Sequence, residues 1–269
     1  MSDAPLTATG LSVGYDAGDV IDGLDLQIPR EQITAVVGAN GCGKSTLLRA
    51  LARLIRPRAG TVLLDGRSIH DRPSKEVARR LGMLPQSPTA PDGLTVEDIV
   101  ARGRFPHQGL FRQWSPGDEA AVEEALAATD MRELRDRLLD ELSGGQRQRA
   151  WIAMTLAQQT ELLLLDEPTT FLDLAHQIDV LDLLDRLVAE RGRTVVMVLH
   201  DINQACRYAD QLVAVRDGRV HAAGPPAEIV DDAFIHDVFG LQARVVEDPV
   251  TATPLCLPIA HPRRSRCTT

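Results

Sequence analysis

The chain has 269 residues, of which 44% are hydrophobic, enough to bury the core of one large α/β domain or two small ones. Its formal net charge of −9 argues against a nucleic-acid partner, because such a partner calls for a basic face. No apolar run approaches the roughly 18–20 residues that a membrane span needs. We therefore expect a chain that is soluble by itself and that meets a membrane only through another protein.

The cysteines are scattered and form no C-x-x-C pair or Cys/His cluster, so they give no sign of a metal site and fit a reducing cytosol. The N-terminus has no charged segment followed by an apolar stretch, so we expect no signal peptide. The four cysteines are Cys42, Cys206, Cys256 and Cys267.

Residues Leu6 to Val37 predict short β segments separated by turns. Alternation with polar residues indicates a half-buried strand at Leu24, Leu26 and Ile28. The apolar run Ile33 to Val37 ends in a glycine-rich loop. A helix follows, whose apolar residues at helical spacing are Leu47, Leu48, Leu51 and Leu54. Thr61 to Leu64 predicts another strand, closed by Asp65-Gly66.

The section from Thr95 to Gln158 is expected to be mostly helical, with Thr95 as one helix cap and Ser115-Pro116 as a second helix start. Leu162 to Leu165 and Val195 to Leu199 are continuous apolar runs, which is typical of strands buried on both faces of a parallel sheet. An amphipathic helix between them is indicated by Ile178, Leu181, Leu184 and Val188. After Phe239 we expect only a proline-rich tail.

The glycine-rich loop fits the pattern G-x-x-x-x-G-K-[ST] and stands between a predicted strand and a predicted helix, as a phosphate-binding loop requires. Its backbone N–H groups would face phosphate oxygens, and Lys44 would reach the β and γ phosphates of a nucleoside triphosphate. Ser45 would ligate Mg²⁺ and Thr46 would meet the α-phosphate. A chance turn is improbable over eight matched positions. The nucleotide-binding residues predicted here are Gly38, Asn40, Gly41, Cys42, Gly43, Lys44, Ser45 and Thr46.

A second motif, Leu142-Ser143-Gly144-Gly145-Gln146, opens the last predicted helix of the middle section. Ser143 and Gln146 form the capping-box pattern S-x-x-Q. A capping box does not need both glycines, which weaken a helix, so we interpret this helix start as an anion site. The sequence L-S-G-G-Q marks ATP-binding-cassette (ABC) ATPases, and the chain resembles that family over nearly its whole length.

The resemblance implies an α/β fold: a P-loop NTPase (RecA-like) core with a parallel sheet, an antiparallel β subdomain and a helical subdomain. It places the ABC ATPase domain at residues 1–240, the helical subdomain at about 90–158 and a short C-terminal extension at 241–269. It also implies that Ser143 to Gln146 contact the γ-phosphate of ATP held by the opposite protomer. ATP would then join two copies in a head-to-tail homodimer.

The run Leu162 to Leu165 ends in Asp166 and Glu167 and resembles the Walker B element. Asp166 would hold Mg²⁺, and Glu167 would act as general base on the attacking water. Two solvated carboxylates at an ordinary strand end are the alternative. The phosphate-binding loop upstream and Pro168-Thr169-Thr170 downstream favour the catalytic interpretation.

Four further residues match family positions. The resemblance implies that His200 bonds the γ-phosphate, that Gln86 senses Mg²⁺ and links to the transport partner, and that Tyr15 stacks on adenine. Asp173 matches the D-loop aspartate. The residues before it depart from the common Ser-Ala-Leu-Asp, since this chain has Phe171-Leu172-Asp173.

Within the family, three stretches resemble ATPases of ferric-siderophore importers of the enterobactin type; vitamin B12 and haem importers share parts of them. A non-transport ABC ATPase, an inactive regulatory cassette and an exporter subunit are the alternatives. Intact Lys44, Asp166, Glu167 and His200 argue against an inactive cassette. The stretches are Arg102 to Gln108, Pro168 to Gln177 and His200 to Asp210.

The implied partners are ATP with Mg²⁺, a second copy of the chain, integral-membrane permease subunits and, indirectly, a substrate-binding protein. The chain would lie peripherally on the cytoplasmic face of the cell membrane. We expect the permease to dock near Gln86 and the segment Arg102 to Trp114. Core packing of the helical section accounts for its apolar cluster equally well. The cluster contains Phe105, Leu110, Phe111 and Trp114.

Overall fold

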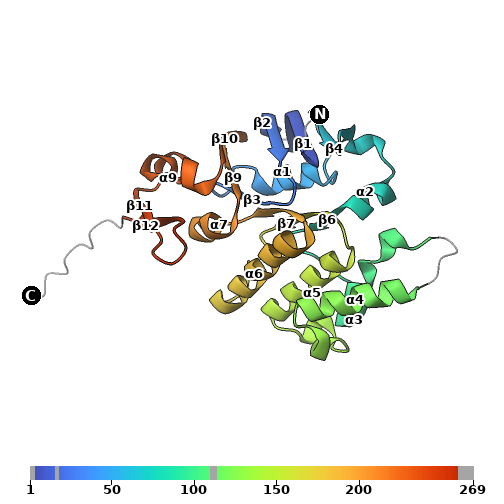
Figure 1. Cartoon of the computed structure of the whole chain (residues 1–269). Coiled ribbons are helices and arrows are strands. Elements are labelled where there is room, and N and C mark those ends of the chain that lie inside the picture. The colour runs from blue at the N-terminus through green and yellow to red at the C-terminus, as the bar shows by residue number, and fades with distance from the viewer. Residues whose placement is uncertain (1–3, 16–17, 110–113, 260–269) are drawn as a thin grey trace, which may run out of the picture.

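The structure, a computed structural model, describes residues 4–15, 18–109 and 114–259. Its centre is a six-stranded sheet in the order β10-β9-β3-β8-β7-β6, in which only the edge strand β10 runs antiparallel to its neighbour (Figure 1). The strands are β3 (Ile33–Val37), β6 (Leu81–Leu84), β7 (Leu162–Asp166), β8 (Thr194–Val198), β9 (Gln211–Arg216) and β10 (Arg219–Gly224).

The central strands are buried on both faces, which explains their continuous apolar runs. On β8, Val195 and Met197 belong to a core shared with the helices, whereas Val196 and Val198 belong to a second core under the antiparallel sheet. The predicted strand is confirmed with a shift of one residue, since Leu199 follows the strand instead of ending it.

A four-stranded antiparallel sheet covers the second core in the order β2-β1-β4-β5. Its strands are β1 (Leu6–Tyr15), β2 (Gly18–Ile28), β4 (Ala59–Leu64) and β5 (Arg67–Ser68). The predicted alternation in β2 is confirmed, because Leu24, Leu26 and Ile28 are buried and the residues between them are exposed. Asp65 and Gly66 both have positive φ and close the β4–β5 turn, as the sequence indicated.

The helix α1 (Lys44–Leu51) packs under this sheet, but it is shorter than predicted. It ends at Leu51 because Arg53 adopts a left-handed conformation with φ 63°, which no α-helix can continue. Leu54 therefore lies outside the helix and is 64% exposed, so its assignment to the buried helix face was wrong.

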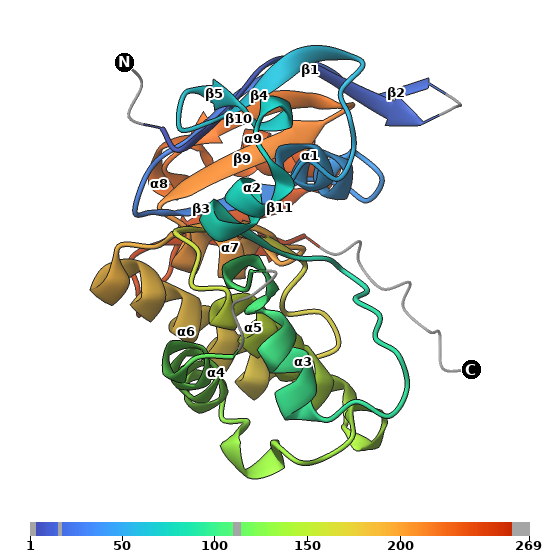
Figure 2. The ribbon, with the colours of Figure 1, turned by 90° about the vertical axis from the view of Figure 1, so that its right-hand side faces the viewer.

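The predicted helical section forms a layer of its own below the sheets (Figure 2). Each of the three α-helices described there starts at a capping box, formed by Thr95, Ser115 and Ser143. Arg104 is buried there against Asp118, with Nε 2.9 Å from Oδ1. The helices are α3 (Val96–Arg102), α4 (Pro116–Ala128) and α5 (Gly144–Ala157), with short 3₁₀ turns at Phe105–His107, Arg132–Leu134 and Leu139–Glu141.

The helix α6 (Leu174–Arg191) is confirmed, although its buried face is rotated from the predicted one. Leu181 and Leu184 are fully buried as expected, but Ile178 and Val188 are only half-buried.

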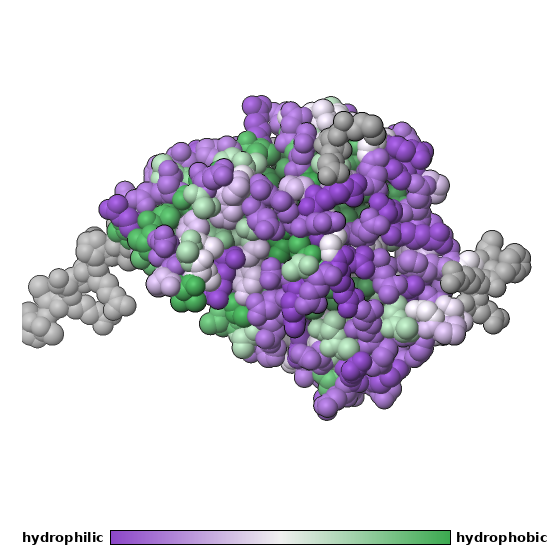
Figure 3. Space-filling model, in the orientation of Figure 1, coloured by the Kyte–Doolittle hydropathy of each residue, from purple (hydrophilic) through white to green (hydrophobic). Residues whose placement is uncertain are grey.

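Hydrophilic residues cover most of the face seen in Figure 3, with smaller hydrophobic patches between them. None of the helices in the described part of the chain is long and apolar enough to cross a bilayer.

A hairpin occupies part of the region where only a proline-rich tail was predicted (Figure 1). It packs on α7 through Asn203, whose amide bonds the backbone N–H and C=O of Cys256. The elements beyond those already named are α2 (Ser74–Arg80), α7 (Ile202–Tyr208), α8 (Pro226–Ile229), α9 (Asp232–Phe239), β11 (Ala243–Glu247), β12 (Pro254–Pro258) and a 3₁₀ turn at Ile69–Asp71.

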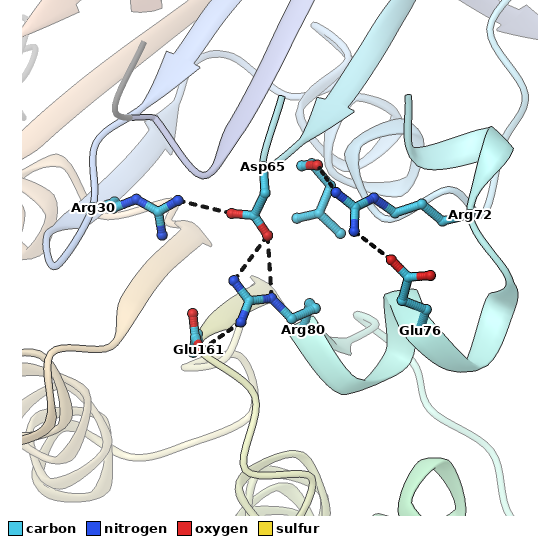
Figure 4. A network of polar contacts seen from close by, with 7 residues as sticks. Arg30, Asp65, Arg72, Glu76, Arg80 and Glu161 are labelled. Atoms are coloured by element: carbon cyan, nitrogen blue, oxygen red, sulfur yellow. Dashed lines mark hydrogen bonds and ion pairs between the residues drawn. The ribbon is translucent and has the colours of Figure 1, made fainter. Parts of the chain in front are cut away.

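Asp65 joins three parts of the fold (Figure 4). Its carboxylate accepts hydrogen bonds from Arg30, between β2 and β3, and from Arg80 at the end of α2. Arg80 also bonds Glu161, just before β7, with 2.6 Å between Nη1 and Oε1. Burial raises the pKa of Asp65, but the two guanidinium groups outweigh it and hold that pKa below its ordinary value.

We expect Asp65→Asn to lower the free energy of unfolding by about 1 kcal/mol at pH 7, because it removes a partly exposed charge from two guanidinium partners. Asparagine tolerates the positive φ at this position, so the change isolates the charge. Because the pKa of Asp65 is lower in the folded state, its charge stabilises the fold above the unfolded-state pKa of about 4. That stabilisation is lost as pH falls. Urea titrations should thus show a wild-type advantage that shrinks below about pH 4; an advantage independent of pH would contradict the assignment.

Candidate functional site

The loop between β3 and α1 wraps around the buried side chain of Lys44. Lys44 Nζ donates to the carbonyl oxygens of Gly38 and Ala39, each at 2.9 Å. The helix begins at Lys44, and no side chain in the described part of the chain caps it. Its first N–H groups are therefore open to an anion, and the positive end of the helix dipole points the same way.

Two of the loop glycines lie so close to neighbouring residues that a side chain would clash. A Cβ on Gly38 would lie 2.2 Å from the carbonyl oxygen of Val215, and a Cβ on Gly43 would lie 2.7 Å from Ile21 Cδ1. Both residues also have positive φ, which side chains disfavour. The loop therefore holds its shape only with glycine at these positions.

Asp166 ends β7 directly below this loop and is fully buried. Its Oδ1 accepts from Ser45 Oγ at 2.9 Å, whereas its Oδ2 has no hydrogen-bond partner within the described residues. Burial raises the pKa of Asp166, and the bond from Ser45 only partly opposes that effect. A buried carboxylate oxygen without a donor beside a hydroxyl suits a small hard cation.

Glu167 is buried, has φ 56° and is held from several sides. His200 Nε2 lies 2.6 Å from its Oε1, and Thr170 Oγ1 donates to its Oε2 at 3.0 Å. Burial raises the pKa of Glu167, but hydrogen bonds from His200, Gln86 and Thr170 outweigh it and keep that pKa below its ordinary value. Glu167 is therefore held as a carboxylate at neutral pH.

Glu167, His200, Gln86 and most of the phosphate-binding loop surround one open cavity of about 420 Å³, so the structure brings together most of the predicted phosphate and catalytic residues. Gly38, Cys42 and Asp166 are not part of its lining. Sequence analysis missed Val20, which has no polar group to mark it, and Thr170. No sequence signal indicated Thr170, because its bond to Glu167 depends on the turn from Thr170 N to Glu167 O. The cavity is lined by Val20, Asn40, Gly41, Gly43, Lys44, Ser45, Thr46, Gln86, Glu167 and His200.

The other predicted residues lie outside this lining, within the described part of the chain. Ser143 and Gln146 make the expected reciprocal capping box at the start of α5, and Gly144 and Gly145 lie in its first turn. Asp173 caps α6 and bonds His176. Tyr15 ends β1 and is half-exposed. Their assignments to nucleotide binding stay predictions.

Comparison with known proteins places these motifs in a family. Residues 21–170 match the family described as ABC transporter. The chain belongs to this family. It is 54% identical over 256 residues to the achromobactin transport ATP-binding protein of Dickeya dadantii, with 95% of each chain covered. It is 53% identical over 260 residues to the ferric enterobactin transport ATP-binding protein of Escherichia coli, covering 97% of this chain and 96% of that one.

Solved ABC structures have the same fold. A chain of an inward-facing ABC transporter, ascribed to the metal-chelate type, matches with a TM-score of 0.82 at 30% identity, covering 96% of this chain and 98% of that one. A dimeric bacterial ABC transporter cassette matches with a TM-score of 0.74 at 27% identity, covering 82% and 98%. The predicted fold class is confirmed. The chain is an ATP-binding, ATP-hydrolysing subunit of an ABC transporter.

Proposed function

We propose that this ATPase powers the import of a ferric siderophore. The observation that carries the proposal is the 53–54% identity, over nearly the whole chain, to subunits named for achromobactin and ferric enterobactin transport. The three stretches noted in the sequence, beginning at Arg102, Pro168 and His200, support the same cargo class. In this proposal the chain lies on the cytoplasmic face of the membrane, below its permease, and a substrate-binding protein delivers the cargo on the other side.

Lys44 and the N–H groups at the start of α1 would bind the phosphates of ATP, with Thr46 beside them. Mg²⁺ fits Ser45 and Asp166, because the buried Oδ2 of Asp166 lacks a donor and Ser45 Oγ lies beside the same carboxylate. When bound, Mg²⁺ would neutralise phosphate charge. Gln86, which bonds Glu167, would sense this site.

Glu167 would be the general base, because it is ionised, held in one orientation and turned toward the phosphate cavity. His200, on the same cavity, would bond the γ-phosphate. Tyr15 would meet adenine, and Asp173 with Ser143 to Gln146 would act on the nucleotide of the opposite protomer. Residues 1–240 would form the ATPase domain, with a helical subdomain at about 90–158 and an extension at 241–269.

The surface near Gln86 and residues 102–114 would receive the permease. Phe105 is 60% exposed and Trp114 is 44% exposed, which supports docking over core packing for these two members of the predicted cluster. Arg104 is instead part of the buried core. Leu110 and Phe111 lie outside the described residues.

Deleting the gene is expected to abolish uptake of radiolabelled ferric siderophore and to slow growth under iron starvation. The wild-type gene should restore uptake, whereas a Glu167→Gln copy should not, because transport depends on hydrolysis. Vitamin B12 and haem uptake should be measured in the same strain. Normal siderophore uptake with loss of B12 or haem uptake would overturn the cargo and leave the ATPase assignment intact.

A further inference from the structure

Phe171 is an exposed aromatic side chain in a chain with only 3% aromatic residues. It is 78% exposed, and the nearby Leu174 is 71% exposed. Leu172 between them is buried and anchors the loop from β7 to α6. The anchoring of Leu172 leaves Phe171 facing outward. Apolar area held in water in this way is stabilised only when another surface covers it.

The backbone of Phe171 is also in an unusual conformation, with φ 68°. Bulky residues rarely adopt positive φ, and such conformations gather at functional sites. Backbone hydrogen bonds from Thr170 N to Glu167 O and from Leu172 N to Thr169 O fix two overlapping turns, and Phe171 lies in the second. The loop therefore holds Phe171 in place although the aromatic ring gains little burial inside its own protomer.

Phe171 lies beside the Ser143 to Gln146 segment. A Cβ built on Gly144 would be 3.9 Å from Phe171 Cβ. In the proposed composite site, this segment faces the phosphate-binding loop of the opposite protomer. Phe171 would then face residues close to the phosphate-binding loop of the opposite protomer.

A second cavity, of about 680 Å³, lies in that neighbourhood. It shares Val20, Asn40 and Gly41 with the nucleotide cavity and extends to the end of α9. Phe239 and the buried Val238 of α9 contribute apolar surface to it, beside Cys42 of the phosphate-binding loop. The polar and charged side chains that also line it are Asp19, Arg216, Asp217, His236 and Asp237. Its size exceeds what one aromatic side chain needs.

We propose that, in the ATP-bound dimer, Phe171 of each protomer enters the partner's cavity between the phosphate-binding loop and α9. The proposal rests on the proposed function, because it uses the composite site between two copies of the chain. A second copy is the occupant because the exposed residue and the cavity each adjoin one half of that site. The alanine that stands at this position in the common Ser-Ala-Leu-Asp pattern would provide a much smaller apolar contact.

This contact would also affect the catalytic loop. Phe171 directly follows Thr170, whose hydroxyl holds Glu167. Insertion of Phe171 into the partner would therefore fix the loop that positions the general base, and it would do so only in the closed dimer.

The test is the dissociation constant of the ATP-bound dimer, measured by sedimentation in a Glu167→Gln background. Phe171→Asn removes the aromatic ring but tolerates positive φ, so the protomer should keep its thermal stability. We expect it to raise the dissociation constant at least roughly tenfold, as removal of a central aromatic anchor does. Leu54→Asn, at an exposed apolar residue after α1, is the matched control and should leave the dissociation constant unchanged. An unchanged constant for Phe171→Asn would overturn the proposal.

A crosslink tests the location of the contact. With Phe171→Cys and Cys267→Ser, a short bis-maleimide should join residue 171 of one protomer to Cys42 of the other, only when ATP is present. Adding Cys42→Ser should abolish the product; a product that persists would contradict the proposed cavity. Ser143→Arg distinguishes a failure of the proposed composite site from a failure of the proposed Phe171 insertion. If it abolishes the dimer while Phe171→Asn does not weaken it, the composite site stands and the insertion is wrong. If ATP produces no dimer, both fail.

Discussion

Replacing Glu167 with glutamine should lower the rate of ATP hydrolysis by about 10²–10⁴-fold while ATP still binds, because a general base contributes that much to a proton transfer. The amide has the same shape and can still accept the hydrogen bond from Thr170, but it cannot take a proton from water. ATP-bound dimers should therefore accumulate. Phosphate release, nucleotide binding and sedimentation measure the three effects separately.

The matched control is Glu190→Gln, which makes the same chemical change on the exposed face of α6. It should hydrolyse ATP at the wild-type rate. If Glu167→Gln also turns over ATP at that rate, another group is the base. If Glu167→Gln loses ATP binding as well, the carboxylate has a role in holding the nucleotide that its bonds to His200 and Thr170 do not indicate.

Sequence patterns predicted β3, β7 and β8 of the central sheet because parallel strands are buried on both faces, so a short continuous apolar run such as Ile33 to Val37 strongly favours a buried strand. They did not predict β6, β9 and β10. The cap at Thr95, the helix start at Ser115 and the capping box at Ser143 were equally accessible, since a cap depends on residues close together in the sequence. The phosphate-binding loop required only its motif and its position between a strand and a helix.

The features that were missed depend on contacts between distant residues. The hairpin at β11 and β12 packs through Asn203 and Cys256, which are 53 positions apart, and Pro254 and Pro258 made its second strand look like a tail. The end of α1 depends on the left-handed Arg53, for which the spacing of leucines gives no sign. Local patterns contain no information on such pairings.

The catalytic cluster was predicted as separate motifs, and the structure adds how they meet. No spacing rule places Thr170 against Glu167, because that bond depends on the turn that gives Glu167 a positive φ. The carboxylate–His200 contact likewise joins the ends of β7 and β8, which only the strand order brings together.

A mixture of two inactive variants should regain activity if Ser143 acts across the dimer. Lys44→Ala removes the ammonium group that would contact the phosphates in the proposed site. Ser143→Arg removes the cap of α5 and brings a cation to a helix N-terminus, where the dipole disfavours it. Each homodimer then has two damaged sites. A mixed dimer has one intact site, made of the unaltered Lys44 of one protomer and the unaltered Ser143 of the other.

Random pairing makes half of the dimers mixed, so an equal mixture should hydrolyse ATP at about one quarter of the wild-type rate if the sites are independent. As a control, both changes are placed in one chain and mixed with wild type. Mixed dimers then have no intact site, and activity should also fall to about a quarter instead of the half expected if Ser143 served its own chain. A Ser143→Arg homodimer with full activity would show that this segment takes no part in hydrolysis, whereas an inactive mixture would assign Ser143 to its own protomer's site.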